Sequence, residues 1–191
     1  MANAAQHKDN LVQTAMRLFR QQGYASTGLQ QVLAESGAPK GSLYHYFPNG
    51  KEALGEAAVK LAGDLMGQML LRLAERHKQP RAFVKAYCDV IAGWMEESQF
   101  RSGCPIATTM LETAPHSPRL TEAGMQAFDR WIDIVASVLA RAGLSQKEAR
   151  VRGQLLIATM EGALLMARMR QSTQPIKDIA VAYRSFGGDG H

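Results

Sequence analysis

The sequence is poor in the features that mark secreted, membrane-spanning and metal-binding proteins. Two cysteines in 191 residues are too few for a disulfide framework, so we expect reduced thiols in the cytoplasm. No apolar run approaches the roughly 18 residues of a membrane span. The first residues, MANAAQHKDN, show no apolar stretch after a basic one, so we expect neither membrane insertion nor secretion. The five histidines are scattered without H-x-x-x-H or C-x-x-C spacing, which predicts no metal and no cofactor.

Two common catalytic motifs are also missing. Lys40-Gly41-Ser42 has the wrong order for a phosphate-binding P-loop, and no G-x-S-x-G nucleophile motif occurs. We therefore expect no catalytic residues and no enzyme activity. The composition is that of a globular chain with a real core, with 46% hydrophobic and 20% charged residues. The net charge of +5 suits a nucleic-acid binder without identifying one.

Helical periodicity runs through nearly the whole chain, and no segment alternates as a strand does. The sequence therefore predicts an all-α fold. The expected helices cover residues 8–22, 28–36, 39–47, 51–78, 81–98, 106–112, 119–142 and 146–171, with a last short helix from Pro175 through Phe186. The final GGDGH is expected to fray. Thr27 is predicted to cap the second helix, with Gln30 completing a capping box, and Pro39 to occupy the first turn of the third.

The stretch from Thr27 to Lys51 predicts two short helices around a tight turn. The second begins Pro39-Lys40-Gly41-Ser42, so small, hydrogen-bonding and cationic groups stand at its N-terminal end. That is the end that a helix-turn-helix recognition helix inserts into the major groove of DNA. Leu43 and Phe47, four residues apart, are expected to anchor the inward side of this helix. This pattern predicts an N-terminal DNA-binding segment.

The candidate DNA contacts are of three kinds. Lys40 and Lys51 would neutralise phosphates, Thr27 and the free N–H groups of its helix start would bind another phosphate, and Ser42 or His45 would reach a base edge. The whole set is Thr27, Gln30, Gln31, Pro39, Lys40, Gly41, Ser42, Tyr44, His45, Tyr46 and Lys51. The alternative is that these are solvated surface groups. For Tyr46 it is packing beneath the long helix that follows.

The order and spacing of several short strings resemble the TetR family of bacterial repressors. The strings are Ala15–Phe19, Gly23–Thr27, Gly41–Phe47 and Lys51–Leu54. Two positions depart from the commonest pattern, with Gly28 where a serine is usual and Pro39 where a capping serine or threonine precedes Lys-Gly. The resemblance implies a three-helix helix-turn-helix domain over residues 1–50.

Three further strings resemble the LmrA/YxaF-type subgroup of that family. They are FPNGKEAL, Gly103–Ala107 and Met160–Arg168. The resemblance implies a helical effector-binding and dimerisation domain over residues 51–191. It also implies a homodimeric repressor that binds a palindromic operator in double-stranded DNA and is released by a small, largely apolar ligand. Two rival readings stay open: a helix-turn-helix activator or effector-independent DNA binder, and a small helical enzyme with a basic helix.

The C-terminal sites are predicted from helical spacing and composition. Small residues let two helices approach closely, so the dimer surface is expected at Leu155, Thr159, Gly162, Ala163 and Met166, the alternative being internal core. An adaptable apolar pocket is expected to involve Met69, Trp94, Cys104, Met110, Phe128, Trp131, Met160 and Glu161. The alternatives are core packing for the apolar side chains, a surface ion pair for Glu161, and either packing or redox chemistry for Cys104.

Overall fold

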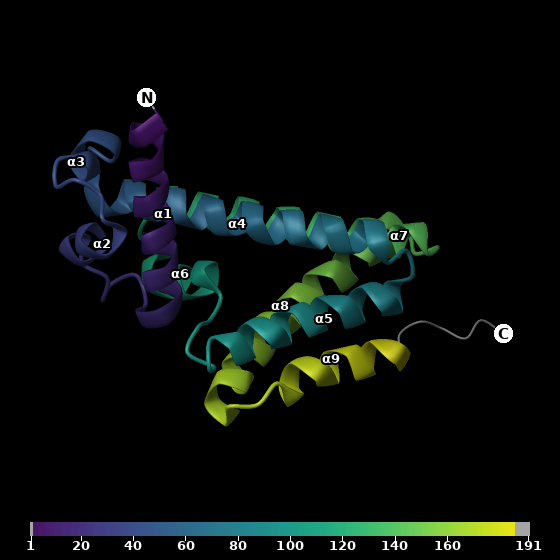
Figure 1. The fold of residues 1–191 in the computed structure, drawn as a ribbon. Helices are drawn as coiled ribbons and strands as arrows, with labels where there is room; N and C mark the ends of the chain where they lie inside the picture. Colours follow the sequence, from purple (N-terminus) through teal and green to yellow (C-terminus); the bar gives the residue numbers. More distant parts are fainter. Residues whose placement is uncertain (1, 186–191) are drawn as a thin grey trace. The chain divides into compact units, whose positions relative to one another are not determined.

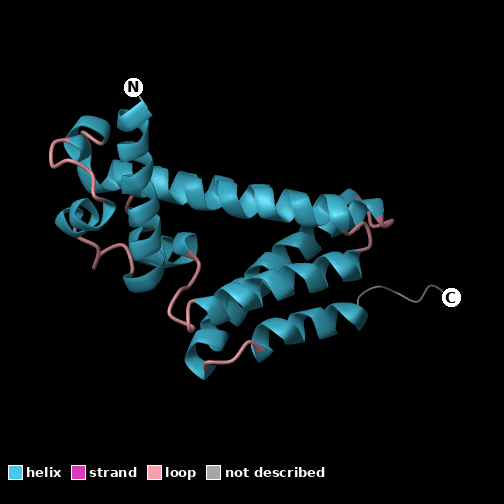
Figure 2. Cartoon of the chain, in the orientation of Figure 1, coloured by secondary structure: helices cyan, strands magenta, loops and turns pink. Residues whose placement is uncertain are grey.

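The computed structural model describes residues 2–185, and every regular element in that range is a helix (Figure 2). This confirms the predicted all-α class. The helices are α1 Ala2–Gln22, α2 Leu29–Ser36, α3 Ser42–Tyr46, α4 Gly50–Arg76, α5 Pro80–Glu97, α6 Pro105–Thr113, α7 Pro118–Arg141, α8 Gln146–Arg170 and α9 Gln174–Ser185. The predicted helix end at Phe186 and the tail GGDGH lie outside the described residues. No helix in the described range is both long and apolar enough to cross a membrane.

The helices pack into two compact units. The first contains the residues up to Leu65 together with Cys104–Ala127, and the second contains Met66–Gly103 together with the residues from Phe128 onward. The first unit thus combines the N-terminal helices with α6, which comes from the middle of the chain. This grouping by contact differs from the division at residue 50, which concerns DNA binding and stays a prediction.

The core of the first unit fixes the three N-terminal helices to one another. Helix α1 lies against both α2 and α3 (Figure 1). The cluster of buried side chains consists of Leu11, Val12, Ala15, Leu18, Phe19, Val32, Leu33, Leu43, Phe47, Leu54 and Ala58. Burying one leucine or phenylalanine side chain contributes about 1.5–3 kcal/mol relative to its exposed state. Leu43 and Phe47 therefore anchor the inward side of α3, as predicted.

The start of α2 differs from the sequence prediction. Its N-cap is Gly28, with no side-chain cap, so the predicted capping box of Thr27 and Gln30 is wrong. Thr27 lies one residue earlier and turns inward, where its hydroxyl donates to the carbonyl of Gly23 at 2.7 Å. Only 1% of Thr27 is exposed. The hydroxyl thus closes the preceding loop instead of capping the helix.

The start of α3 also differs. The helix begins at Ser42 and has five residues, so the prediction that Pro39 lies in its first turn is wrong. Pro39 belongs to a preceding turn, in which the Ser42 N–H donates to its carbonyl at 2.8 Å. Because proline disfavours helical conformation in the residue before it, the chain leaves the left-handed C-cap of α2, Gly37 at φ +65°, without returning directly to a helix.

The second unit is built around α5, α8 and α9, which pack against one another (Figure 1). Helix α8 begins after Ser145, whose hydroxyl accepts a hydrogen bond from the Glu148 N–H. Helix α9 buries Ile176 and Ile179. Near its C-terminal end the Tyr183 hydroxyl donates to the carbonyl of Arg152 in α8 at 3.1 Å. Helix α8 also lies against α7 at Gly153, while another side of α8, which includes Leu155 and Met166, is exposed.

Candidate nucleic-acid interface

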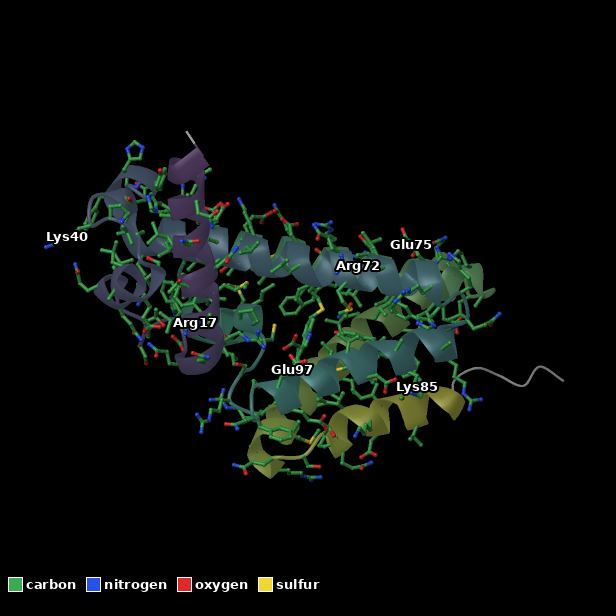
Figure 3. All side chains as sticks on the ribbon, in the orientation of Figure 1. Arg17, Lys40, Arg72, Glu75, Lys85 and Glu97 are labelled. Carbon is green, nitrogen blue, oxygen red and sulfur yellow. The ribbon has the colours of Figure 1, made fainter. Side chains whose placement is uncertain are left out.

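The turn before α3 and the outward side of α3 carry the exposed polar groups. Tyr44 is 58% exposed while its neighbour Leu43 is fully buried, so the two sides of the short helix differ sharply. His45 is exposed beside Tyr44. Lys40 projects from the turn away from the helices (Figure 3) and has no ion-pair partner within residues 2–185. A cation and two polar aromatic rings are therefore exposed on one face, together with Pro39 and Gly41.

Tyr46 and Ser42 occupy the flanks of this face. Tyr46 is half-buried against the core of the first unit. Its ring meets the ring of His45 edge-on, with the centroids 4.9 Å apart. Tyr46 thus supports His45 from the side of the core, and its own contact with DNA stays a prediction. Ser42 is half-buried at the first position of α3.

Thr27 and Lys51 do not present free groups to a phosphate in this structure. The Thr27 hydroxyl is buried on Gly23, as described above. The Lys51 ammonium donates to the carbonyl of Ala25 at 3.1 Å and lies 4.5 Å from the centroid of the Tyr24 ring. Burial lowers the pKa of Lys51, against a smaller opposing effect of the Glu112 charge. Both side chains therefore hold the loop between α1 and α2.

The two glutamines of α2 stand in different surroundings. Gln30 is exposed. The Gln31 amide is held at both ends, because its oxygen accepts from Gln22 of α1 and its nitrogen donates to Glu35, each at 2.9 Å. This fixes the orientation of Gln31 before any DNA is bound.

An ion pair extends that chain of contacts back to α1. Arg17 lies 2.6 Å from the second carboxylate oxygen of Glu35, and Figure 3 shows Arg17 on α1. The hydrogen bonds from Arg17 and then from Gln31 hold the pKa of Glu35 below its usual value. Sequence reasoning missed Arg17, Gln22 and Glu35. The four-residue spacing of Gln31 and Glu35 was the available signal.

The residues predicted for dimerisation divide between two faces of α8. Leu155 is 59% exposed, and Thr159, Gly162 and Met166 are exposed on the same side. Ala163 is 1% exposed, so its place in the predicted surface is wrong. It follows Gly162 by about 100° around the helix, which turns it into the core. Sequence reasoning missed three exposed apolar side chains that extend the stripe: Val151, Leu165 and Met169.

The residues predicted for an effector pocket are distributed over both units. Cys104 and Met110 belong to the first unit, where the Cys104 sulfur caps α6 by accepting from the Ala107 N–H. Of the six in the second unit, Phe128 and Trp131 meet edge-on with their ring centroids 5.1 Å apart. Met69, Trp131 and Met160 are buried, Phe128 and Glu161 are half-buried, and Trp94 is exposed. Their role in ligand binding stays a prediction.

Two hollows in the second unit are lined by other side chains. One, of about 640 Å³, lies between the end of α7 and the start of α8 and includes Asp133, Arg141 and Arg150. The other, of about 330 Å³, lies between α5 and α9 and includes Gln79, Lys85 and Ala180. Within residues 2–185, no three side chains of the metal-binding types gather in a way that would hold a metal ion.

Comparison with known proteins matches both parts of the chain. Residues 11–58 match the family of bacterial regulatory proteins, tetR family, and residues 80–182 match the C-terminal domain of LmrA/YxaF-like transcriptional regulators. Two relatives come from Bacillus subtilis. The transcriptional regulator YxaF is 32% identical, covering 94% of each chain, and LmrA is 31% identical, covering 91% of this chain and 92% of the relative.

A solved structure shows the same fold. The regulatory protein TetR from Rhodobacter sphaeroides superimposes with a TM-score of 0.82 at 22% identity, covering 94% of this chain and 96% of that chain. The matched families and these relatives are transcriptional regulators and not enzymes.

Proposed function

The chain belongs to the TetR family of bacterial transcriptional regulators, and from this premise we propose that it is a repressor that binds a palindromic operator as a homodimer. The observation that carries the proposal is the exposed polar face of the turn and α3, defined by Lys40, Tyr44 and His45. Leu43 and Phe47 hold this face rigidly on the core. Lys40 and Tyr44 would bind phosphates, and His45 or Ser42 would reach a base edge.

The proposed dimer forms through the exposed stripe of α8. An apolar ridge that contains Leu155 and Met166 is costly in water and is covered when a second copy packs on it. At Gly162, nothing lies within 4 Å of the position that a Cβ would take, so a helix from the other copy has room to approach there. Two α3 faces would then meet half-sites about 34–36 Å apart, one turn of B-DNA.

The proposed control is release of DNA by a small, largely apolar effector. The effector would bind among the predicted pocket residues and prefer an arrangement in which the two α3 faces no longer match the operator. Release by about a hundredfold requires roughly 2.7 kcal/mol of difference in effector affinity between the two arrangements. Since the proposed target is chromosomal DNA, we place this action in the cytoplasm.

The first experiment identifies and measures an operator. Bound duplexes are selected from a random pool, and their dissociation constants are measured by fluorescence anisotropy at several salt concentrations. The double variant Lys40→Ala/Tyr44→Ala should bind the selected operator roughly a hundredfold more weakly, because two phosphate contacts are lost in each half-site. Lys78→Ala, which removes an exposed lysine outside this face, is the matched control.

The results separate the proposal from its rivals. Equal binding by the double variant and the control would refute the α3 face as the DNA contact. A footprint over one short palindrome supports operator recognition, whereas diffuse coverage favours a nucleoid-type binder. A reporter gene downstream of the operator distinguishes repression from activation. Compounds are then screened for release of the operator, and an effector that binds without changing operator affinity would refute the proposed switch.

A further inference from the structure

Glu112, near the end of α6, reaches the loop between α1 and α2. Its carboxylate accepts a hydrogen bond from the Ala25 N–H at 2.5 Å. The two residues are 87 positions apart in the sequence but belong to the same compact unit. Backbone N–H groups bonded to a carboxylate form stronger hydrogen bonds than those bonded to neutral acceptors. An acid from the middle of the chain is therefore bound to the backbone just before α2.

The other polar group of Ala25 is held as well. Its carbonyl accepts from the Lys51 ammonium at 3.1 Å. One residue of the loop is thus fixed from two sides, by an acid carried on α6 and by a base carried on α4. The opposite charges of Glu112 and Lys51 also attract each other, which acts to raise the pKa of Lys51 against the effect of its burial. We call this arrangement of Glu112, Ala25 and Lys51 the loop clamp.

Two neighbouring contacts show how closely α6 approaches the end of α1. Gly23 has a φ of +88°, and a Cβ at that position would collide with the Glu112 carboxylate. The positive φ favours glycine there, and the atoms that a Cβ would meet belong to the end of the Glu112 side chain, which lies directly over Gly23. In addition, the Thr108 hydroxyl of α6 lies 3.1 Å from the carbonyl oxygen of Phe19 in α1, and the carbonyls of Cys104 and Pro105 are alternative acceptors at 3.0 and 3.2 Å. Helix α6 therefore contacts the end of α1 as well as the loop that leads to α2.

We infer that Glu112 is a positioning residue for DNA binding. By holding Ala25, its carboxylate sets the path of the loop before α2, and so the place of α2 and α3 against α1. The clamp therefore ties the loop before α2 to α6 and to the start of α4. The inference rests on the proposed function, because it concerns how the same α3 face is positioned.

The test compares two acids of the first unit in the full-length protein. Glu112→Gln removes the charge but keeps an oxygen that can accept a hydrogen bond. Glu112→Ala removes the acceptor as well. Glu122→Gln and Glu122→Ala are the matched controls, because Glu122 is also exposed but accepts a hydrogen bond from Gln126 of its own helix. For each variant we measure amide hydrogen exchange at Ala25 by NMR, the melting temperature, and operator affinity as a function of salt concentration.

In the Glu112→Ala variant, Ala25 should exchange roughly tenfold faster and the operator should bind roughly fivefold more weakly, because a charge-assisted hydrogen bond is lost. Glu112→Gln, which keeps an acceptor, should fall between this variant and the wild type. The salt slope should stay the same, since no phosphate contact is removed. The Glu122 variants should bind at least as tightly as the wild type, because loss of a negative charge alone favours DNA. Operator affinity should thus fall in Glu112→Ala but not in the Glu122 variants. This difference separates a positioning role of Glu112 from the general effect of removing a negative charge.

Two results would overturn the inference. Unchanged exchange at Ala25 in Glu112→Ala would show that the carboxylate does not hold the loop. Faster exchange with operator affinity equal to that of the Glu122 controls would show that the clamp does not act on DNA binding. A wild-type protein that binds no duplex at all would instead refute the proposed function, which is a distinguishable failure.

Discussion

Two outward faces of the chain, that of α3 and that of α8, differ in both chemistry and support. The α3 face is polar, and a helix of five residues carries it, so the core beneath Leu43 and Phe47 supplies its rigidity. The α8 face is apolar and lies on a helix of 25 residues that spans several turns. A polar, cationic face suits a highly charged partner, whereas an apolar ridge suits a second copy of the same surface. Each face is thus matched to a different kind of partner.

The largest expected effect is on the apolar face. Leu155→Arg places a charge in the middle of the α8 stripe and should convert the dimer into a monomer, measured by light scattering during gel filtration. Because a single half-site lacks the gain from bivalent binding, operator affinity should fall by about a hundredfold or more. Leu71→Arg makes the same change at an exposed leucine of α4 and is the control. A Leu155→Arg protein that stays dimeric would refute the assignment of this face.

A smaller effect should distinguish the two lysines near the polar face. Lys40→Gln should reduce the slope of the logarithm of affinity against the logarithm of salt by about 0.9 per half-site, one phosphate contact. Lys51→Gln should leave that slope unchanged but lower the melting temperature, because Lys51 is bound to the Ala25 carbonyl. The measurement is a salt titration of operator binding for both variants. Equal salt slopes for the Lys40→Gln and Lys51→Gln variants would contradict the assignment of Lys40, but not Lys51, as a phosphate contact.

The smallest effect concerns the support beneath the α8 face. Burial raises the pKa of Tyr183 from its ordinary value of 10.0 to about 12. The folded state therefore keeps a proton that the unfolded chain loses, and the free energy of unfolding should fall as pH rises from about 10 to about 12. Tyr183→Phe has no phenolic proton and should not show this fall in the free energy of unfolding. The fall is on the order of 1 kcal/mol after allowance for partial exposure of the side chain.

Urea unfolding at several pH values across that window measures the difference. Burial also raises the pKa of Cys88 to about 12, and the Cys88 charge acts to raise the pKa of Tyr183, so the comparison measures the tyrosine together with its interaction with this thiol. The wild type should lose stability more steeply than Tyr183→Phe. Parallel curves would show that the tyrosine hydroxyl does not titrate differently in the folded and unfolded states.

The long helices were predictable from sequence because periodicity accumulates over many turns. The helix predicted over 146–171 ends one residue earlier in the structure, and the one predicted over 51–78 lies at Gly50–Arg76. The short elements were less predictable. Thr27 satisfies the rule for an N-cap, but its hydroxyl finds the Gly23 carbonyl instead. Whether such a hydroxyl caps the helix or closes the loop depends on the path that core packing gives the backbone. Rules based on local sequence do not describe that path.

The candidate site was predictable to the extent that it depends on which side of a helix faces outward. The anchors Leu43 and Phe47 correctly separated the two sides of α3. Lys51 was expected to neutralise a phosphate, and no sequence pattern indicated that the Tyr24 ring and the Ala25 carbonyl would hold it. Ala163 was assigned to the wrong side because small residues are compatible with both close helix packing and core. Contacts between segments far apart in the sequence, such as that of Glu112 with Ala25, produce no periodic pattern of residues. Sequence periodicity therefore does not predict them.

The unequal anchoring of Gln30 and Gln31 has a consequence for how the protein diversifies. The Gln31 amide is hydrogen-bonded to both Gln22 and Glu35. Replacing Gln31 therefore breaks a contact between α2 and α1 and also changes the surface. Gln30 is exposed and is not part of that chain of contacts. Under the proposed function, substitutions at Gln30 retune base preference at little structural cost, so paralogues with new target sites should diverge there first.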